Sequence, residues 1–91
     1  MNEKLIERKL VAGVKKARGM AIKFTSPFFT GMPDRVVLLR NGEVRFAEIK
    51  TTGQQLSPRQ KIVKEQLERM NIRVDVIDDE QSLSKFLKEI Q

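Results

Sequence analysis

The stretch DRVVLLRNGEVRFAEIKT, residues 34–51, carries the strongest structural signal in this chain. Two largely apolar segments, 34–39 and 43–51, flank the tripeptide Arg40-Asn41-Gly42. Such segments on either side of an Asn-Gly turn predict two antiparallel strands joined by a hairpin. Because side chains alternate between the two faces of a strand, the loop length determines which residues face each other across the hairpin.

Two loop lengths fit this turn, and they arrange the acidic side chains differently. With a two-residue loop at Asn41-Gly42, Asp34 faces Ile49 and shares no face with Glu48. With a three-residue loop, Gly42 takes the left-handed position of a bulge, and Asp34 lies directly opposite Glu48 with Cβ atoms about 5 Å apart. Facing carboxylates destabilise a sheet unless cationic charge lies between them, so the second register predicts a cation site.

The segments before the hairpin predict a helix, a short strand and a loop. Residues 1–17 repeat apolar side chains at helical spacing. The apolar stripe consists of Ile6, Leu10, Val14 and Ala17. Gly19 is expected to end this helix, and 20–24 to form a strand. The segment TSPFFTGMPD, 25–34, contains two prolines and a glycine and predicts a loop.

The segments after the hairpin predict two more helices and one more strand. Ser57-Pro58-Arg59-Gln60 has an N-cap serine, a proline at the first helical position and a glutamine that completes a capping box. Residues 72–77 predict a strand, and Asp78 or Asp79 is expected to cap a last helix. The order α β β β α β α predicts one α/β domain over residues 1–91, with a central mixed sheet flanked by helices.

The composition narrows the possible chemistry. The 91 residues include no cysteine and no histidine, which excludes disulfides, thiolate and imidazole ligands and a histidine base. Any bound metal is therefore expected to be a hard, oxygen-liganded ion such as Mg²⁺, Mn²⁺ or Ca²⁺. The net charge of +6 favours an anionic partner, with nucleic acid as the first candidate. No apolar run approaches the roughly 20 residues of a membrane span, so we expect a cytoplasmic protein without membrane contact.

Glu48 and Lys50 share one face of the predicted strand 43–51, beyond Phe46. Taken alone, this pair is explained equally well as an ion pair without chemistry. Together with Asp34, it has the composition of a site for phosphodiester hydrolysis. In such a site carboxylates hold a hard cation, and a lysine orients water or stabilises charge on the phosphate.

Four short motifs, in this order, resemble a known nuclease family. They are KFTSP at 23–27, GMPD at 31–34, EIK at 48–50 and SPRQ at 57–60. With the helix that carries Glu7, this combination resembles the VRR-NUC (virus-type replication-repair nuclease) family of the PD-(D/E)XK superfamily. The resemblance extends from Glu3 to about Ile77 and implies a core of the restriction-endonuclease type.

The resemblance implies roles for residues of the hairpin. Asp34 and Glu48 would be metal ligands, and the backbone carbonyl of Ile49 would be a further ligand. Lys50 would be the catalytic lysine. The implied metal is Mg²⁺ or Mn²⁺.

Two further residues match the family pattern but also have structural explanations. Gln60 matches a residue that contacts the water, the metal or the scissile phosphate, and the capping box explains it equally well. Glu7 matches a first-helix glutamate that completes the acidic cluster as catalytic residue and metal ligand. Glu3, one turn earlier, is the alternative, and both acids also fit a helix start stabilised by the macrodipole.

Basic and aromatic residues near the predicted site are candidates for contact with DNA. The basic candidates for phosphate binding are Lys23, Arg35, Arg59 and Lys61. Each of them, taken singly, is better explained as a solvated surface charge. Phe28 and Phe29 are expected to pack against the protein, since apolar side chains are usually buried; insertion into branched DNA and contact with a partner are the alternatives.

These observations predict a divalent-metal-dependent DNA endonuclease. The resemblance implies a homodimer that cuts branched DNA, such as four-way (Holliday) junctions, in a bacterial or phage-infected host cell. Dimerisation also suits a chain that can bury only a small core. The alternatives are a non-catalytic nucleic-acid-binding module of the same fold, a sequence-specific restriction-type endonuclease, and a basic structural protein with an incidental ion pair.

Overall fold

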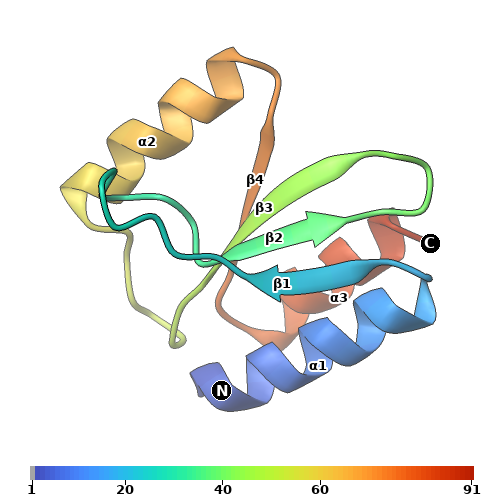
Figure 1. The fold of residues 1–91 in the computed structure, drawn as a ribbon. Coiled ribbons are helices and arrows are strands. Elements are labelled where there is room, and N and C mark those ends of the chain that lie inside the picture. Colours follow the sequence, from blue (N-terminus) through green and yellow to red (C-terminus); the bar gives the residue numbers. More distant parts are fainter. Residues whose placement is uncertain (1) are drawn as a thin grey trace.

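The computed structural model describes residues 2–91 as three helices and four strands (Figure 1). In chain order these are α1 Glu3–Lys16, β1 Met20–Lys23, β2 Arg35–Leu38, β3 Val44–Ile49, α2 Pro58–Arg69, β4 Arg73–Ile77 and α3 Glu80–Glu89. The element order and the mixed sheet confirm the predicted fold class. Within the described residues, no helix has the length and apolar character needed to cross a bilayer.

The four strands form one sheet in the order β1-β2-β3-β4. β1 pairs antiparallel with β2, and β2 pairs antiparallel with β3. β3 and β4 run parallel, and α2 makes the crossover between them. A parallel pair requires such a crossover, whereas the antiparallel pairs need only a loop or a hairpin.

The hairpin between β2 and β3 has the three-residue loop. Leu39 N–H donates to Glu43 O at 2.9 Å, and Gly42 N–H donates to Leu39 O at 2.9 Å. Gly42 has φ 90°, the left-handed conformation that glycine adopts without a steric penalty. The register therefore pairs Leu38 with Val44, as this loop predicts.

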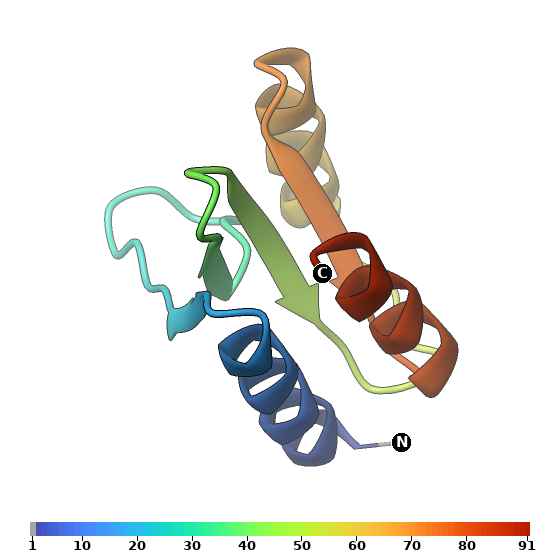
Figure 2. The same cartoon turned by 90° about the vertical axis from the view of Figure 1, so that its right-hand side faces the viewer.

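The helices cover the two faces of the sheet unequally. α1 and α3 lie side by side on one face, and α2 lies on the other (Figures 1 and 2). β3 supplies both cores by alternation: Ala47 and Ile49 pack with α1 and α3, whereas Phe46 packs with α2. Glu48 follows on the same face as Phe46, so the site lies where an apolar face ends.

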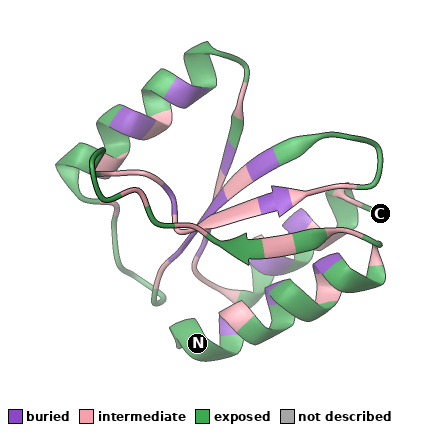
Figure 3. Cartoon of the chain, viewed as in Figure 1, coloured by how far each residue is buried: buried purple, intermediate pink, exposed green. Residues whose placement is uncertain are grey.

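Part of the sheet face that carries α2 remains uncovered. Met20, Ile22 and Val44 share this face by register and alternation, and they are 60%, 43% and 46% exposed. Figure 3 shows that β1 consists mostly of exposed residues. An apolar strip on an edge strand is unusual for a chain that acts as a monomer.

The end of α1 corrects one expectation from the sequence. The left-handed residue is Arg18, with φ 64°, and Gly19 N–H donates to Val14 O at 2.9 Å. This is the hydrogen bond of a Schellman motif, whose left-handed position is usually a glycine but is Arg18 in this chain. Gly19 is required by close packing instead, because a Cβ there would lie 2.6 Å from Leu38 O.

Candidate active site

Asp34 and Glu48 meet at the open end of the β2–β3 hairpin. The register that pairs Arg35 with Ala47 continues by one step to place Asp34 opposite Glu48. Asp34 Oδ1 accepts the N–H of Ile49 at 3.2 Å, which orients the aspartate side chain across the strand pair. Glu48 is buried, with 7% of its surface exposed. The structure therefore brings together the two acids that the sequence predicted as a pair.

Burial raises the pKa of both carboxyls. For Glu48, desolvation is the largest cause and the charge of Asp34 the second, and together they raise its pKa to about 7. Desolvation also raises the pKa of Asp34, while the Ile49 N–H and the Arg35 charge oppose this rise. Two acids whose charged forms are disfavoured in this way are stabilised by a cation held between them.

Lys50 supplies part of the compensating charge. Its Nζ lies 3.9 Å from Glu48 Oε2, and its charge lowers the pKa of Glu48 against the effects of burial and Asp34. This separation is too long for a hydrogen bond, so the ammonium N–H groups of Lys50 are not satisfied by Glu48.

The first helix places its acids beside this pair without joining it. Glu7 Oε2 lies 3.8 Å from Arg35 NH2, and the Glu7 charge raises the pKa of Asp34. The charge of Glu3 raises the pKa of Glu48. Across residues 2–91, no group of three or more acidic side chains gathers closely enough to hold a metal. The choice between Glu7 and Glu3 as a further ligand therefore stays a prediction.

The capping box that the sequence predicts for Gln60 is present in the structure. Gln60 N–H donates to Ser57 Oγ at 3.1 Å, and Gln60 Oε1 accepts the N–H of Ser57 at 2.9 Å. This reciprocal capping box opens α2 and engages the carbonyl oxygen of the glutamine side chain. The side-chain NH₂ group is not used by the capping box, so a catalytic contact through it remains a prediction.

The basic residues predicted to bind phosphates divide into two groups. Arg35 is mostly buried, and its NH1 donates to Ala21 O at 3.4 Å in addition to the ion pair with Glu7. Arg59 holds the loop 25–33: its Nε donates to Thr30 O at 3.2 Å, and its guanidinium lies over the Phe29 ring at 5.2 Å. These two arginines have structural partners within the chain.

Lys23 and Lys61 form the second group of basic candidates. Both side chains are exposed to solvent. Lys23 pairs with Arg35 across β1 and β2, and Lys61 lies in the first turns of α2. Arg59 is exposed as well, but its side chain already holds the loop 25–33, whereas Arg35 is mostly buried.

The expected packing of Phe28 is wrong. Its side chain is 99% exposed, whereas Phe29 is 44% exposed and lies under the Arg59 guanidinium. Arg59 is thus a loop-holding residue that the sequence did not reveal as such. Residues 29 and 59 are far apart along the chain, and no local pattern links them.

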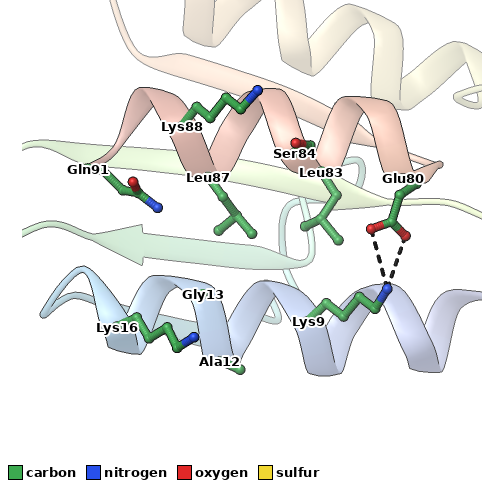
Figure 4. Close-up of a pocket in the computed structure, with 10 residues that line it drawn as sticks. All are labelled: Lys9, Ala12, Gly13, Lys16, Glu80, Leu83, Ser84, Leu87, Lys88 and Gln91. Carbon is green, nitrogen blue, oxygen red and sulfur yellow. Dashed lines mark hydrogen bonds and ion pairs between the residues drawn. The ribbon is translucent and has the colours of Figure 1, made fainter.

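A groove of about 530 Å³ lies apart from the acidic pair, between α1 and α3 (Figure 4). Leu83 and Leu87 line it, and Lys9 bridges its end to Glu80 with an Nζ–Oε2 distance of 3.1 Å. It shares no residue with the hairpin site. The facing carboxylates, rather than this groove, therefore mark the candidate active site.

The donor set of the acidic pair fits a hard divalent cation. Carboxylate and carbonyl oxygens are the ligands that Mg²⁺ and Mn²⁺ prefer, and Asp34 and Glu48 supply two such carboxylates on one side of the hairpin. Burial disfavours the charged form of both carboxylates, so a bound cation would stabilise their ionised state. Lys50, at 3.9 Å from Glu48, compensates only part of this effect.

Comparisons with known proteins show which family the chain resembles. A family model described as the VRR-NUC domain matches residues 3–80. A protein named "Putative nuclease p44", from Acyrthosiphon pisum secondary endosymbiont phage 1, is 40% identical over 87 residues, which cover 96% of this chain and 92% of that protein. A solved structure described as a VRR-NUC domain matches with a TM-score of 0.90 at 20% identity, over 98% of this chain and 97% of that one. At this identity the structural likeness concerns the fold.

Proposed function

The chain belongs to the VRR-NUC family, a family of nuclease-type domains, and from this premise we propose that it is a Mg²⁺- or Mn²⁺-dependent DNA endonuclease. The observation that carries the proposal is the meeting of Asp34 and Glu48 beside Lys50. A module that only binds DNA gains nothing from two buried acids near phosphate, since they repel the backbone. A hydrolytic centre needs them to hold a cation.

Asp34 and Glu48 are the residues that would hold the metal, with the carbonyl of Ile49 as a further oxygen ligand. The Ile49 N–H already orients Asp34 at 3.2 Å, so the same backbone segment positions both groups. When bound, the ion supplies Lewis-acid activation of the phosphodiester. The burial of Glu48 limits screening by water and strengthens its interaction with any bound cation.

Lys50 is the residue that acts on the nucleophile and on the phosphate. Its ammonium group has N–H donors that Glu48 does not satisfy at 3.9 Å. These donors can orient the attacking water or bond a phosphate oxygen on which negative charge grows in the transition state. Glu7, whose charge raises the pKa of Asp34 from α1, is the proposed further carboxylate ligand, and Gln60 is the proposed donor through its side-chain NH₂ at the start of α2.

Branched DNA, such as a four-way junction, is the proposed substrate, and a homodimer is the proposed active form. Two copies related by a two-fold axis would present two centres to two strands of a junction. The uncovered apolar strip formed by Met20, Ile22 and Val44 supports self-association, because pairing would remove it from water. Likeness to a phage protein supports a bacterial or phage-infected cytoplasm as the setting.

Cleavage of a labelled four-way junction with Mg²⁺ or Mn²⁺ tests the proposal, with linear duplex of the same sequence as the matched substrate. We expect paired cuts near the branch point and loss of cutting in Lys50→Ala. Binding without cleavage in every divalent ion would favour the non-catalytic module instead. Preferred cutting at one sequence on linear duplex would favour the restriction-type alternative.

A further inference from the structure

Phe28 is the most exposed large apolar side chain among residues 2–91. It is 99% exposed, whereas the next most exposed ones, Met20 and Met70, reach 60%. A fully exposed aromatic ring forgoes the favourable free energy that its burial would provide. Its neighbour Phe29 is 44% exposed and packs under Arg59, so partial burial is possible in the same loop.

The loop that carries Phe28 is held at several points. Phe24 N–H donates to Asp34 O at 2.8 Å and closes its base, and Phe29 N–H donates to Ser26 O at 3.3 Å across a turn. Arg59 Nε bonds Thr30 O at 3.2 Å. Phe28 therefore projects from the tip of an anchored turn, which makes it a preorganised contact.

Gly31 brings this loop against the start of α2. It has φ 94°, and a Cβ there would lie 2.8 Å from Arg59 Cγ and 2.9 Å from Val63 Cγ2. Only glycine fits this close approach in a left-handed conformation. The approach, with the packing of Phe29 under Arg59, fixes the loop that carries Phe28 against the first turns of α2, where the helix dipole and the exposed Lys61 favour a phosphate backbone.

The same loop leads directly into the candidate active site. Asp34 follows Phe28 by six residues, so the two Cα atoms lie within about 20 Å even for a fully extended chain. Because successive nucleotides in a DNA strand rise about 3.4 Å, this distance corresponds to at most about six nucleotides, so DNA cut at Asp34 can reach Phe28. An aromatic ring at that distance can meet a base of the same substrate.

We propose that Phe28 stacks on a nucleobase at the branch point of the DNA bound in the active site. This inference rests on the proposed function and names the feature of the substrate that the loop contacts. Inside a regular duplex each base stacks on neighbouring bases with both faces. A base at a branch point lacks a neighbour on one side, so one of its faces is open. A single planar ring on a basic surface suits such a base better than it suits a protein partner.

The absence of tryptophan and tyrosine from the chain allows a direct optical test. Phe28→Trp introduces a single fluorophore at the proposed contact, and Met70→Trp introduces one at an exposed site at the other end of α2. With Ca²⁺ replacing Mg²⁺, and gels confirming that the DNA stays intact, junction DNA should quench the first fluorophore strongly. The second should change little, and equal quenching of both would contradict the proposal.

Affinity measurements separate stacking from simple apolar contact. Phe28→Ala and Phe28→Leu should raise the Kd for the junction by about 5- to 100-fold, because base–aromatic stacking contributes about 1–3 kcal/mol. Phe28→Trp should retain the affinity, and Kd for linear duplex should change less than about two-fold in all three. Wild-type affinity in Phe28→Ala, or in Phe28→Leu, would overturn the inference.

Two further outcomes distinguish base stacking by Phe28 from a dimer contact and from a failure of the proposed active centre. If sedimentation velocity shows that Phe28→Ala converts a dimer to a monomer, the ring packs on a second copy and the stacking proposal is wrong. If Lys50→Ala cuts junctions as well as the wild type does, the proposed active centre fails, and the fluorescence result still decides whether Phe28 stacks. Unchanged binding by every Phe28 variant, with cleavage abolished by Lys50→Ala, leaves the nuclease and removes only the stacking contact.

Discussion

Lys50 Nζ lies 3.9 Å from Glu48 Oε2, and both side chains are largely buried, at 18% and 9% exposure. The ammonium therefore opposes the desolvation of Glu48 and the repulsion from Asp34, but it does not bring the pKa of Glu48 back to its ordinary range. A buried acid that remains difficult to ionise near neutral pH is a poor stabilising element. Its presence is better explained by the chemistry of a cation and a phosphate.

Replacing the lysine should separate binding from catalysis. We expect Lys50→Ala to lower the cleavage rate by roughly 100-fold or more, because it removes a donor aimed at charge that grows in the transition state. Affinity for the junction should change by less than about five-fold, since one of many phosphate contacts is lost. Single-turnover cleavage assays and binding assays measure the two effects. Lys85→Ala, on the exposed side of α3, is the control, because it removes one positive charge away from the site. An equal fall in both variants would contradict it.

Removing the buried charge should stabilise the metal-free protein. The folded-state pKa of Glu48 is raised from 4.5 to about 7, so its contribution to stability is complete below about pH 4.5 and is lost as pH rises through 7. Glu48→Gln does not titrate, and we expect it to be more stable than the wild type at pH 8 by about 2 kcal/mol. At pH 4.5 the difference should nearly vanish.

Thermal unfolding at both pH values, with EDTA present, measures this difference in stability. For a domain of this size the gain at pH 8 corresponds to a rise in Tm of roughly 10 °C. Glu65→Gln, an exposed substitution on α2, is the control and should shift Tm little at either pH. A Glu48→Gln variant that is less stable than the wild type at pH 8 would show that the carboxylate has a compensating partner.

Divalent cations should stabilise the wild type through the same pair of acids. At a metal concentration of 100 times Kd, binding to the folded state alone adds about 2.7 kcal/mol. We expect Mn²⁺ and Mg²⁺ to raise Tm in the wild type and to leave the Asp34→Asn/Glu48→Gln double variant unchanged. Differential scanning fluorimetry with an added dye checks this. An equal rise in the double variant would place the metal elsewhere.

The hairpin loop should be sensitive to the side chain at position 42. Gly42 has φ 90°, and no heavy atom lies within 4 Å of the place that a Cβ would occupy, so strain rather than a clash limits substitution. Gly42→Val should lower the free energy of unfolding by about 1–2 kcal/mol, whereas Gly42→Asn should be better tolerated, because asparagine enters the left-handed region more readily. Urea unfolding measures both, and equal losses in the two variants would contradict the conformational explanation.

Gln60 can be tested by a substitution that keeps the cap. Gln60→Ala removes the side-chain half of the capping box and should cost about 1 kcal/mol of stability. Gln60→Glu preserves the capping pattern and should restore stability, but we expect cleavage to fall because a carboxylate replaces the NH₂ donor near the phosphate. Full cleavage by Gln60→Glu would assign Gln60 to the cap alone.

The features that could be predicted from residues 34–51 were local ones. Strand segments, the Asn-Gly turn and the left-handed position of Gly42 depend on the preferences of neighbouring residues. Once the loop has three residues, the pairing of Asp34 with Glu48 follows from strand alternation alone. The capping box at Ser57 could be predicted for the same reason. The sequence also predicted a cap at Asp78 or Asp79, and the structure has Asp79 in that position.

The errors concern residues whose environment depends on distant parts of the chain. Phe28 was expected to be buried, but no surface of the fold reaches it, while Phe29 one position later is held by Arg59. Gly19 was expected to provide the helix-ending conformation, but Arg18 adopts it, and Gly19 makes room for β2.

The linear order of residues therefore specified the elements and limited the hairpin to two registers, because turn chemistry and strand alternation act over a few residues. The structure decided for the register that pairs Asp34 with Glu48. The partners of Arg35 and Arg59, and the exposure of Phe28, depended on how α1, α2 and the loop 25–33 pack on the sheet. So did the burial that raises the pKa of Glu48 to about 7, since desolvation comes from the surrounding fold and not from adjacent residues.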